Sequence, residues 1–418
     1  MNDHKFSPES LMMSYGYKPE LSEGSVKCPI FQTSTFSFKK AEDGKAFFEV
    51  AYGLREKGEK EELGLIYSRL NNPDLEILEN RLCLWDGAED CAVFESGMSA
   101  ISTVLMEFTK PGDVLLYSLP VYGGTDHFIK HILTKYMVEV VPYSSSDSRE
   151  DIINRLEATG KADKLAMVYV ETPANPTNRL IDLKMCKSIA DQYSNDEKQV
   201  YMAVDNTYMG PLWSHPLEIG ADIVMYSATK YIGGHSDVIA GAVLGSAELM
   251  VRVKTLRTFL GNMAGPWTGW LLMRSLETLK VRMDQQATNA KALAEFLVKH
   301  NKVEKVHYLG FLKEKDPKEY EVFKSNGYKT AGAMISVLVK GGEKEAFTLL
   351  NNLKLAKLAV SLGSTETLVQ HPASMTHAGI DPEEKKKFGI SENLVRVSVG
   401  VENSNDLIYD FEQALSKI

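Results

Sequence analysis

The 418-residue sequence lacks most features that mark membrane, metal-binding or disulfide-rich proteins. No apolar run approaches the roughly 18 residues that a transmembrane helix requires. Its four cysteines are widely spaced and form no CxxC pair, so neither a disulfide framework nor a cysteine-ligated metal is expected. No HExxH motif occurs, and the N-terminus has no apolar centre of a signal peptide. We therefore expect a cytoplasmic protein without metal ligands or a membrane segment.

The sequence also has fewer basic than acidic residues. There are 47 Lys and Arg against 56 Asp and Glu, which gives a net charge of −9. Nucleic-acid binding requires a basic face to meet phosphates, so we expect no nucleic-acid partner. The sequence has no GxxxxGK[ST] motif and no strand followed by GxGxxG, which excludes the two commonest glycine-rich nucleotide sites. A small-molecule substrate is expected instead.

The apolar segments indicate an α/β protein with more than one domain, since the chain exceeds one ordinary hydrophobic core. Short apolar runs separated by helical spacing predict a mainly parallel sheet with helices on both faces. A charged stretch, 55–62, is typical of a loop or a solvated helix face. We predict an N-terminal arm (1–70), a large domain (71–265) and a smaller α/β domain (266–418). The predicted strands are 91–94, 114–117, 165–170, 201–204, 221–226, 333–339 and 394–399, and the predicted helices are 74–85, 97–108, 271–299, 344–353 and 407–415.

The segment from Tyr226 to Asp237 carries the first candidate catalytic residue. An apolar run that ends at Tyr226 predicts a buried strand, and Lys230 follows it just before a Gly-Gly turn. Burial lowers the pKa of a lysine and favours the free amine, the form that makes a Schiff base with an aldehyde. Position alone also suits a surface lysine at a strand end, so a second signal is needed.

Asp205 provides that second signal, because it ends another apolar run, 200–204. Pyridoxal phosphate (PLP) needs an amine for its aldehyde and an acid for its ring nitrogen. An ionised Asp205 facing that nitrogen would keep it protonated. A carboxylate after a strand is also a common helix cap or turn residue. A lysine and an aspartate in this order together predict a PLP site.

Two segments carry a family resemblance. AVDNTYMGPL (203–212) and SATKYIGGHSDVIAG (227–241) resemble the Cys/Met-metabolism, or trans-sulfuration, family of PLP enzymes. This family includes methionine γ-lyase, the cystathionine lyases, cystathionine γ-synthase and the acylhomoserine sulfhydrylases. The resemblance extends from about Pro29 to the C-terminus. It implies a PLP cofactor bound to Lys230, the aspartate-aminotransferase-like type I fold, and an assembly of subunits.

Residues between a predicted strand and helix are candidates for holding the cofactor phosphate. Ser96-Gly97-Met98 opens a helix, where free backbone N–H groups and the helix dipole attract an anion. Simple N-capping by Ser96 is the alternative. The resemblance implies that Gly97 and Met98 contact the phosphate through the backbone. Ser227 and Thr229, on either side of the lysine turn, are candidates for hydroxyl contacts to the same group.

Tyr67 and Arg69 follow the charged stretch. A surface Tyr–Arg pair would be the ordinary interpretation, although arginine also suits bidentate contact with phosphate. The resemblance implies that both residues reach the cofactor phosphate of a neighbouring subunit. It therefore predicts a dimer with shared active sites, and typically a homotetramer of two such dimers. This would explain an N-terminal arm without a core of its own.

Tyr122 and Asn175 are candidates for contacts with the cofactor ring. Tyr122 precedes two glycines and could stack on the ring, although a core tyrosine in a turn has the same pattern. The resemblance implies that Tyr122 also transfers a proton at the leaving group. Asn175 lies in ETPANP, where the family implies a hydrogen bond to the phenolic oxygen of the ring. An asparagine between prolines is otherwise a turn residue.

Arg396 lies inside a strongly apolar predicted strand near the C-terminus. A buried arginine without an anionic partner is costly, by several kcal/mol in order of magnitude. The alternatives are an internal salt bridge to a glutamate and a substrate carboxylate, and the resemblance implies the latter. It also places Ser361 and Thr376 in the substrate pocket. We expect His235, His371 and His377 to be structural.

The exact reaction is less determined than the family. The run 360–377 resembles methionine γ-lyase, and Val360 differs from the glutamate of many cystathionine γ-lyases and bacterial γ-synthases. However, Gly124 stands where methionine γ-lyases carry a cysteine, and Arg257-Thr258 stands near their lysine–aspartate pair. Elimination from L-methionine or L-cystathionine is therefore the first hypothesis. Cystathionine γ-synthase, O-acylhomoserine sulfhydrylase and cystathionine β-lyase are the alternatives.

A non-enzymatic function must also be considered, namely that of a PLP-fold regulator. Such regulators carry an added DNA-binding domain. The N-terminal arm has neither a helix-turn-helix pattern nor a basic patch. Because lysine, aspartate and arginine are all present, we favour an enzyme.

Overall fold

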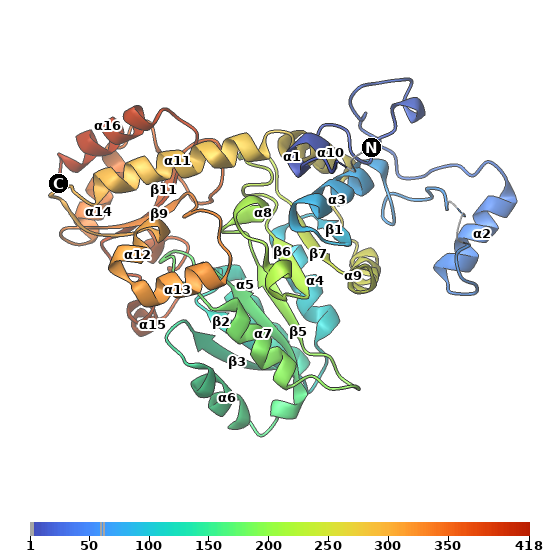
Figure 1. The fold of residues 1–418 in the computed structure, drawn as a ribbon, viewed down its shortest axis with the longest axis horizontal. Coiled ribbons are helices and arrows are strands. Elements are labelled where there is room, and N and C mark those ends of the chain that lie inside the picture. The colour runs from blue at the N-terminus through green and yellow to red at the C-terminus, as the bar shows by residue number, and fades with distance from the viewer. Residues whose placement is uncertain (1–3, 59–60, 62) are drawn as a thin grey trace.

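The computed structural model describes residues 4–58, 61 and 63–418 (Figure 1). Part of the predicted charged stretch, Glu59, Lys60 and Glu62, lies outside the described residues. The described part of that stretch is a loop, as predicted, in which Arg55 pairs with Glu61. In the described part of the chain, no helix combines the length and apolar character needed to cross a bilayer.

The larger of two sheets has seven strands in the order β1-β7-β6-β5-β4-β2-β3. All neighbours pair in parallel except those of β7, which runs antiparallel to β1 and β6. The strands are β1 (Asp90–Phe94), β2 (Val114–Leu119), β3 (Glu139–Ser144), β4 (Leu165–Glu171), β5 (Tyr201–Asp205), β6 (Ile223–Tyr226) and β7 (Gly241–Gly245).

Both faces of this sheet are buried, which explains why its strands are nearly continuous apolar runs. In β1, Cys91 and Val93 belong to one hydrophobic core, whereas Ala92 and Phe94 belong to another on the opposite face. The helices of this part are α3 (Pro73–Asp86), α4 (Gly97–Phe108), α5 (Gly123–His131), α6 (Arg149–Glu157), α7 (Leu183–Gln192), α8 (Gly210–Trp213) and α9 (Ala247–Leu260). The predicted mainly parallel α/β sheet is therefore confirmed.

The smaller sheet has five strands in the order β10-β11-β12-β9-β8 and lies at the other end of the molecule (Figure 1). Its strands are β8 (Val303–His307), β9 (Met334–Val339), β10 (Lys357–Leu358), β11 (Leu368–Gln370) and β12 (Leu394–Ser398). The helices here are α11 (Leu279–Leu297), α12 (Leu312–Lys315), α13 (Pro317–Ser325), α14 (Glu343–Asn352), α15 (Pro382–Lys387) and α16 (Ser404–Leu415). Along the sequence, α10 (Pro266–Leu276) separates the strands of the large sheet from those of the smaller one. The proposed domain boundaries stay a prediction.

One predicted helix is wrong, because it is not continuous. The helix predicted over 271–299 is divided into α10 and α11, because Thr278 leaves the helical region (φ −113°, ψ 5°). The guanidinium of Arg282 and the hydroxyl of Thr278 both donate to the Ser275 carbonyl and satisfy the end of α10.

The N-terminal segment contains two helices that the sequence pattern did not predict, α1 (Pro8–Leu11) and α2 (Ala41–Ala51). The part around α2 extends away from the two sheets, whereas α1 packs against α3 (Figure 1). Several large apolar side chains on this arm are exposed, including Leu21, Val26, Tyr52 and Leu54.

Candidate active site

The candidate residues of the large sheet lie just beyond the carboxyl ends of its parallel strands. This edge is where open α/β sheets bind ligands. Each contributing strand ends in a loop that carries one or more candidates. Gly97 and Met98 follow β1, Tyr122 follows β2, Asn175 follows β4, Asp205 ends β5, and Ser227, Thr229 and Lys230 follow β6.

Lys230 is largely buried, and its Nζ donates to Ser361 Oγ over 2.8 Å. Burial, and to a lesser degree the positive charge of Arg396, lower the pKa of Lys230 to about 8. The amine is therefore free in part at neutral pH, which is what attack on an aldehyde requires.

Asp205 is buried, with 5% of its surface exposed. Its Oδ1 accepts from the Thr207 backbone N–H at 3.0 Å, and the Tyr169 hydroxyl lies 3.5 Å from Oδ2. Burial raises the pKa of Asp205, and within the described residues no cation is among the groups that perturb it. A cationic partner from outside the chain, such as a protonated ring nitrogen, would relieve that cost.

Arg396 occupies the middle of the smaller sheet, on β12, and is 2% exposed. It donates to Asn175 Oδ1 over 3.0 Å and to the Ser361 carbonyl. Burial lowers the pKa of Arg396, and within the described residues no carboxylate is among the groups that perturb it. The alternative of an internal salt bridge to a glutamate is therefore not supported by the described part of the structure.

Gln370 and Thr376 complete the surroundings of Arg396. With its amide oxygen toward Arg396, Gln370 accepts from both terminal guanidinium nitrogens (3.3 and 3.2 Å) and from the Thr376 hydroxyl (3.0 Å). Arg396 is thus held by neutral acceptors alone, which leaves its charge available for an anionic ligand.

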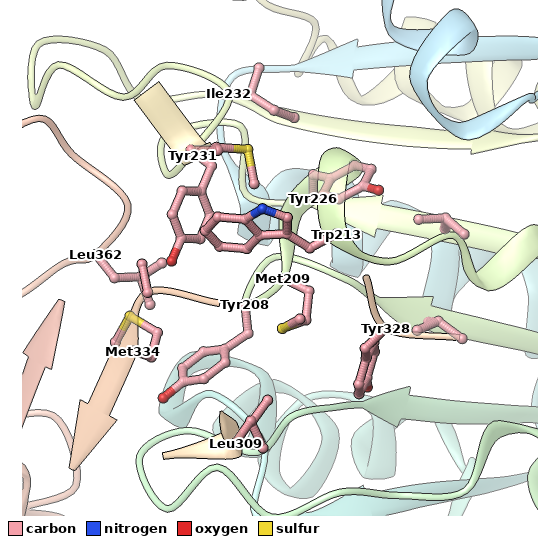
Figure 2. Close-up of a cluster of buried hydrophobic side chains, with 14 of the residues drawn as sticks. Tyr208, Met209, Trp213, Tyr226, Tyr231, Ile232, Leu309, Tyr328, Met334 and Leu362 are labelled. Carbon is pink, nitrogen blue, oxygen red and sulfur yellow. The ribbon is translucent and has the colours of Figure 1, made fainter. Parts of the chain in front are cut away.

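An aromatic and aliphatic cluster joins residues that follow the strands of the large sheet, such as Tyr208 and Tyr231, with Met334 of β9 in the smaller sheet (Figure 2). The ring of Tyr231 packs edge-on against Trp213, with ring centroids 5.2 Å apart, and points toward Leu362. The loop of Ser361 approaches through Gly363, where an added Cβ would lie 2.7 Å from the Tyr231 nitrogen. This close contact sets the position of Ser361 relative to Lys230.

The start of α4 packs directly on the lysine loop. A Cβ on Gly97 would lie 2.7 Å from Ser227 Cβ, so only glycine allows this approach. Gly97 and Met98 are the first two residues of α4, where backbone N–H groups have no partner within the helix. The Thr229 hydroxyl, in contrast, already donates to the Ala240 carbonyl and accepts from its N–H.

Tyr122 lies at the start of α5 and is 47% exposed. Its ring packs on Gly124, where an added Cβ would lie 2.7 Å from the ring and 3.1 Å from Met98 Sδ. The adjacent Gly123 faces the Thr376 carbonyl. Tyr122 therefore lies between the N-terminus of α4 and the loop of the smaller sheet that carries Thr376.

Tyr67 and Arg69 are not brought to this group within the described chain. Arg69 donates to the Thr258 carbonyl over 3.0 Å, and its guanidinium lies 5.7 Å from the Tyr67 ring centroid. Both residues belong to the arm, and Tyr67 is 41% exposed. Within one subunit, the geometry corresponds to the surface Tyr–Arg pair.

Sequence reasoning missed three residues that contact the candidates, namely Tyr169, Glu171 and Gln370. Glu171 begins the ETPANP segment, but its burial beside Asp205 depends on strand register, which the sequence does not reveal. Tyr169 lies within an apolar run, and Gln370 directly follows two apolar residues. The sequence therefore gives no sign of the polar contacts that these two side chains make.

The residues present fit PLP. A free amine, an uncompensated buried carboxylate and an unfilled helix N-terminus share one edge of the large sheet. In addition, Asn175 uses its side-chain oxygen to accept from Arg396, which leaves its amide N–H₂ to donate to a phenolic oxygen. Within the described residues, no cluster of three metal-ligating side chains competes with this interpretation.

Comparisons with known proteins show the family. The chain is 43% identical over 397 residues to the L-methionine gamma-lyase of Fusobacterium nucleatum, with 94% of each chain covered. It is 36% identical to the cystathionine gamma-lyase of Bacillus subtilis, covering 98% of this chain and 99% of that one. The structure matches cystathionine gamma synthase of Xanthomonas oryzae in complex with cystathionine with a TM-score of 0.86, at 31% identity and 99% coverage of both chains. The model of the family described as "Cys/Met metabolism PLP-dependent enzyme" matches residues 9–416. The predicted PLP dependence, type I fold and family are thereby confirmed, and the chain belongs to the Cys/Met-metabolism family of PLP-dependent enzymes.

Proposed function

We propose that the protein is a PLP-dependent carbon–sulfur lyase of sulfur amino acids. It would eliminate a thiol from L-methionine or L-cystathionine and give a 2-oxo acid and ammonia. One observation carries the proposal: the amine of Lys230 and the guanidinium of Arg396 meet at one residue, Ser361, and Arg396 is paired with no carboxylate in the described chain. This pair suits an amino acid bound by its carboxylate with its α-carbon near the lysine.

Bound here, PLP supplies an electron sink for negative charge that develops at the substrate α-carbon. Asp205 would hold the proton on the ring nitrogen, and Gly97, Met98 and Ser227 would hold the phosphate. Thr229 would join them by exchanging the Ala240 carbonyl for a phosphate oxygen. Asn175 would donate to the phenolic oxygen, consistent with its free amide N–H₂.

The substrate's own groups would meet five side chains. Arg396 would bind the carboxylate, with Ser361 and Thr376 beside it. Lys230, as the free amine, would remove the α-proton. Tyr122 would contact the cofactor ring and move a proton at the leaving sulfur, for which its half-exposed position beside Gly124 leaves access.

The test is product identification. Purified holoenzyme is incubated with L-methionine and, separately, with L-cystathionine, and the 2-oxo acid is identified by mass spectrometry. 2-Oxobutyrate indicates γ-elimination, and pyruvate indicates β-elimination. Lys230→Ala should lose both turnover and the absorbance of lysine-bound PLP. Substantial turnover in that variant would refute the assignment of Lys230.

Gly124 favours a second candidate, γ-replacement by a cystathionine γ-synthase or sulfhydrylase. The missing side chain at this position leaves Tyr122 packed on the backbone, and cystathionine gamma synthases are among the similar solved structures. If neither amino acid yields a 2-oxo acid, incubation with an O-acylhomoserine and cysteine tests this alternative.

We further propose a homotetramer built from two dimers that share active sites. Support comes from Tyr67 and Arg69, which make no contact with the lysine loop of their own chain, and from the exposed apolar side chains of the arm. Light scattering gives the mass. Mixing Arg69→Ala with Lys230→Ala subunits tests site sharing, because a mixed dimer regains one intact site only if Arg69 acts across the interface.

Finally, we propose a cytoplasmic location. The four cysteines are all unpaired and three are buried, which is consistent with a reducing compartment. Cell fractionation followed by immunoblotting tests this location.

A further inference from the structure

A second buried carboxylate lies beside Asp205. Glu171 ends β4 and is the register partner of Asp205 on the adjacent parallel strand β5. Both residues are 5% exposed, and neither forms an ion pair within the described chain. Burying two carboxylates side by side on adjacent strands costs free energy unless one of them carries a proton.

Hydrogen bonds tie Glu171 to two loops of the site. Its Oε2 accepts from the backbone N–H of Tyr122 over 2.7 Å, and the backbone N–H of Asn175 also donates to its carboxyl group. Glu171 therefore connects the loop after β2 with the loop after β4. The carbonyl of Tyr122 accepts from the Asp126 N–H within α5 over 3.0 Å, so Glu171 holds the one end of this peptide that the helix does not.

The surroundings decide which carboxyl group is charged. Burial, and then the charge of Asp205, raise the pKa of Glu171 well above its usual value. Burial also raises the pKa of Asp205, and hydrogen bonds from Thr207 and Tyr169 oppose that effect. At Glu171 the backbone hydrogen bonds from Tyr122 and Asn175 oppose the rise in the same way, but of the two residues Glu171 alone has the charge of the neighbouring carboxylate among the causes that raise its pKa. Among the described residues, Glu171 also perturbs Tyr169 and Tyr208, and burial raises the pKa of both, so they stay neutral. We place the shared proton on Glu171.

We propose that Glu171 is a positioning residue, an inference that rests on the proposed function. As the neutral acid it fixes the main chain of Tyr122, and it leaves Asp205 as the one anion available to the ring nitrogen of the cofactor. The side chain at position 171 must be long enough to reach the Tyr122 backbone N–H, and it must be neutral. A negative charge on Glu171 would compete with Asp205 for the ring nitrogen.

Three substitutions separate these properties. Glu171→Ala removes the acceptor and should lower kcat by roughly ten- to a hundredfold, because Tyr122 loses its anchor. Glu171→Gln keeps length and neutrality and should recover most of that loss. Glu171→Asp keeps the acid but is shorter by one methylene group and should not. Recovery by Asp and not by Gln would overturn the proposal.

A second measurement does not depend on turnover or on the substrate. In the infrared difference spectrum between wild-type and Glu171→Gln holoenzyme at pH 7, we expect loss of a carboxylic-acid C=O band. Loss of carboxylate bands instead would overturn the neutral assignment. Circular dichroism shows whether Glu171→Ala folds, and the Gln variant keeps both tests decisive if it does not. If no sulfur amino acid is cleaved, the proposed function fails, while the infrared result still decides the state of Glu171.

Discussion

The free amine of Lys230 gives a quantitative prediction. Burial and the charge of Arg396 bring the pKa of Lys230 to about 8. At pH 7 roughly one tenth of the lysine is then neutral, compared with about 0.04% for an ordinary lysine of pKa about 10.4. Burial and the charge of Arg396 together therefore increase the reactive form about 200-fold at pH 7.

The perturbation that tests this cause is Arg396→Met, which removes the second positive charge. The pKa of Lys230 should rise, because a like charge no longer disfavours its protonated form. It should remain below the ordinary lysine value, since burial is the larger cause and persists. Less free amine at neutral pH then means slower capture of PLP by the apoenzyme.

The assay mixes apoenzyme with PLP at pH values from about 6 to 10, a range over which the amine changes from protonated to free. It follows the absorbance of lysine-bound cofactor. The wild-type rate should rise with pH and level off above about 8, following the pKa of Lys230. In Arg396→Met the midpoint moves to higher pH. Arg149→Met removes an equal charge on α6 and should leave the midpoint unchanged, and Lys230→Ala should give no signal. A wild-type midpoint near that of free lysine would refute the burial argument.

Three further substitutions test the site. Gly97→Ala should weaken PLP binding by about tenfold or more in equilibrium dialysis, because the new Cβ would lie 2.7 Å from Ser227 Cβ; unchanged affinity would contradict the role of this close contact. Gly124→Cys should displace the Tyr122 ring, 2.7 Å from the added Cβ, and lower kcat by roughly tenfold or more with any one substrate. A crystal structure of that variant with the ring unmoved would be evidence against it. Asp205→Asn keeps the shape but loses the charge, so kcat should fall by about a hundredfold or more. A nearly wild-type kcat would exclude an ion pair with the ring nitrogen.

Much of the large sheet could be predicted from the sequence, because buried parallel strands are short, continuous apolar runs. β6 ends at Tyr226 as predicted, and α4 has the predicted bounds. β7 was missed because its glycines and alanine give a weak strand signal. The division between α10 and α11 was missed because it depends on Thr278 and on a guanidinium contact from Arg282, which helical spacing does not record.

The candidate site shows a similar limit. Motifs indicated which residues to consider, but they gave no information on partners across the two sheets. The hydrogen bond between Lys230 and Ser361 joins residues 131 positions apart, and that between Arg396 and Asn175 joins residues 221 apart. Such pairs depend on how the sheets dock, which follows from contacts such as Gly363 against Tyr231 rather than from any local pattern.

The arrangement of charge at the site explains why these residues are buried at all. A fold selected for stability alone would pair or remove the charges of Lys230, Asp205 and Arg396, since unpaired buried charge is costly. Here the large sheet supplies the amine and the carboxylate, and the smaller sheet supplies the guanidinium. Each lacks an opposite charge of its own within the described chain. A protonated ring nitrogen would compensate Asp205, and a substrate carboxylate would compensate Arg396. The missing partners are the groups that the proposed function would supply: the carboxylate of an amino acid held across the sheets, and the cationic ring of the cofactor beside it.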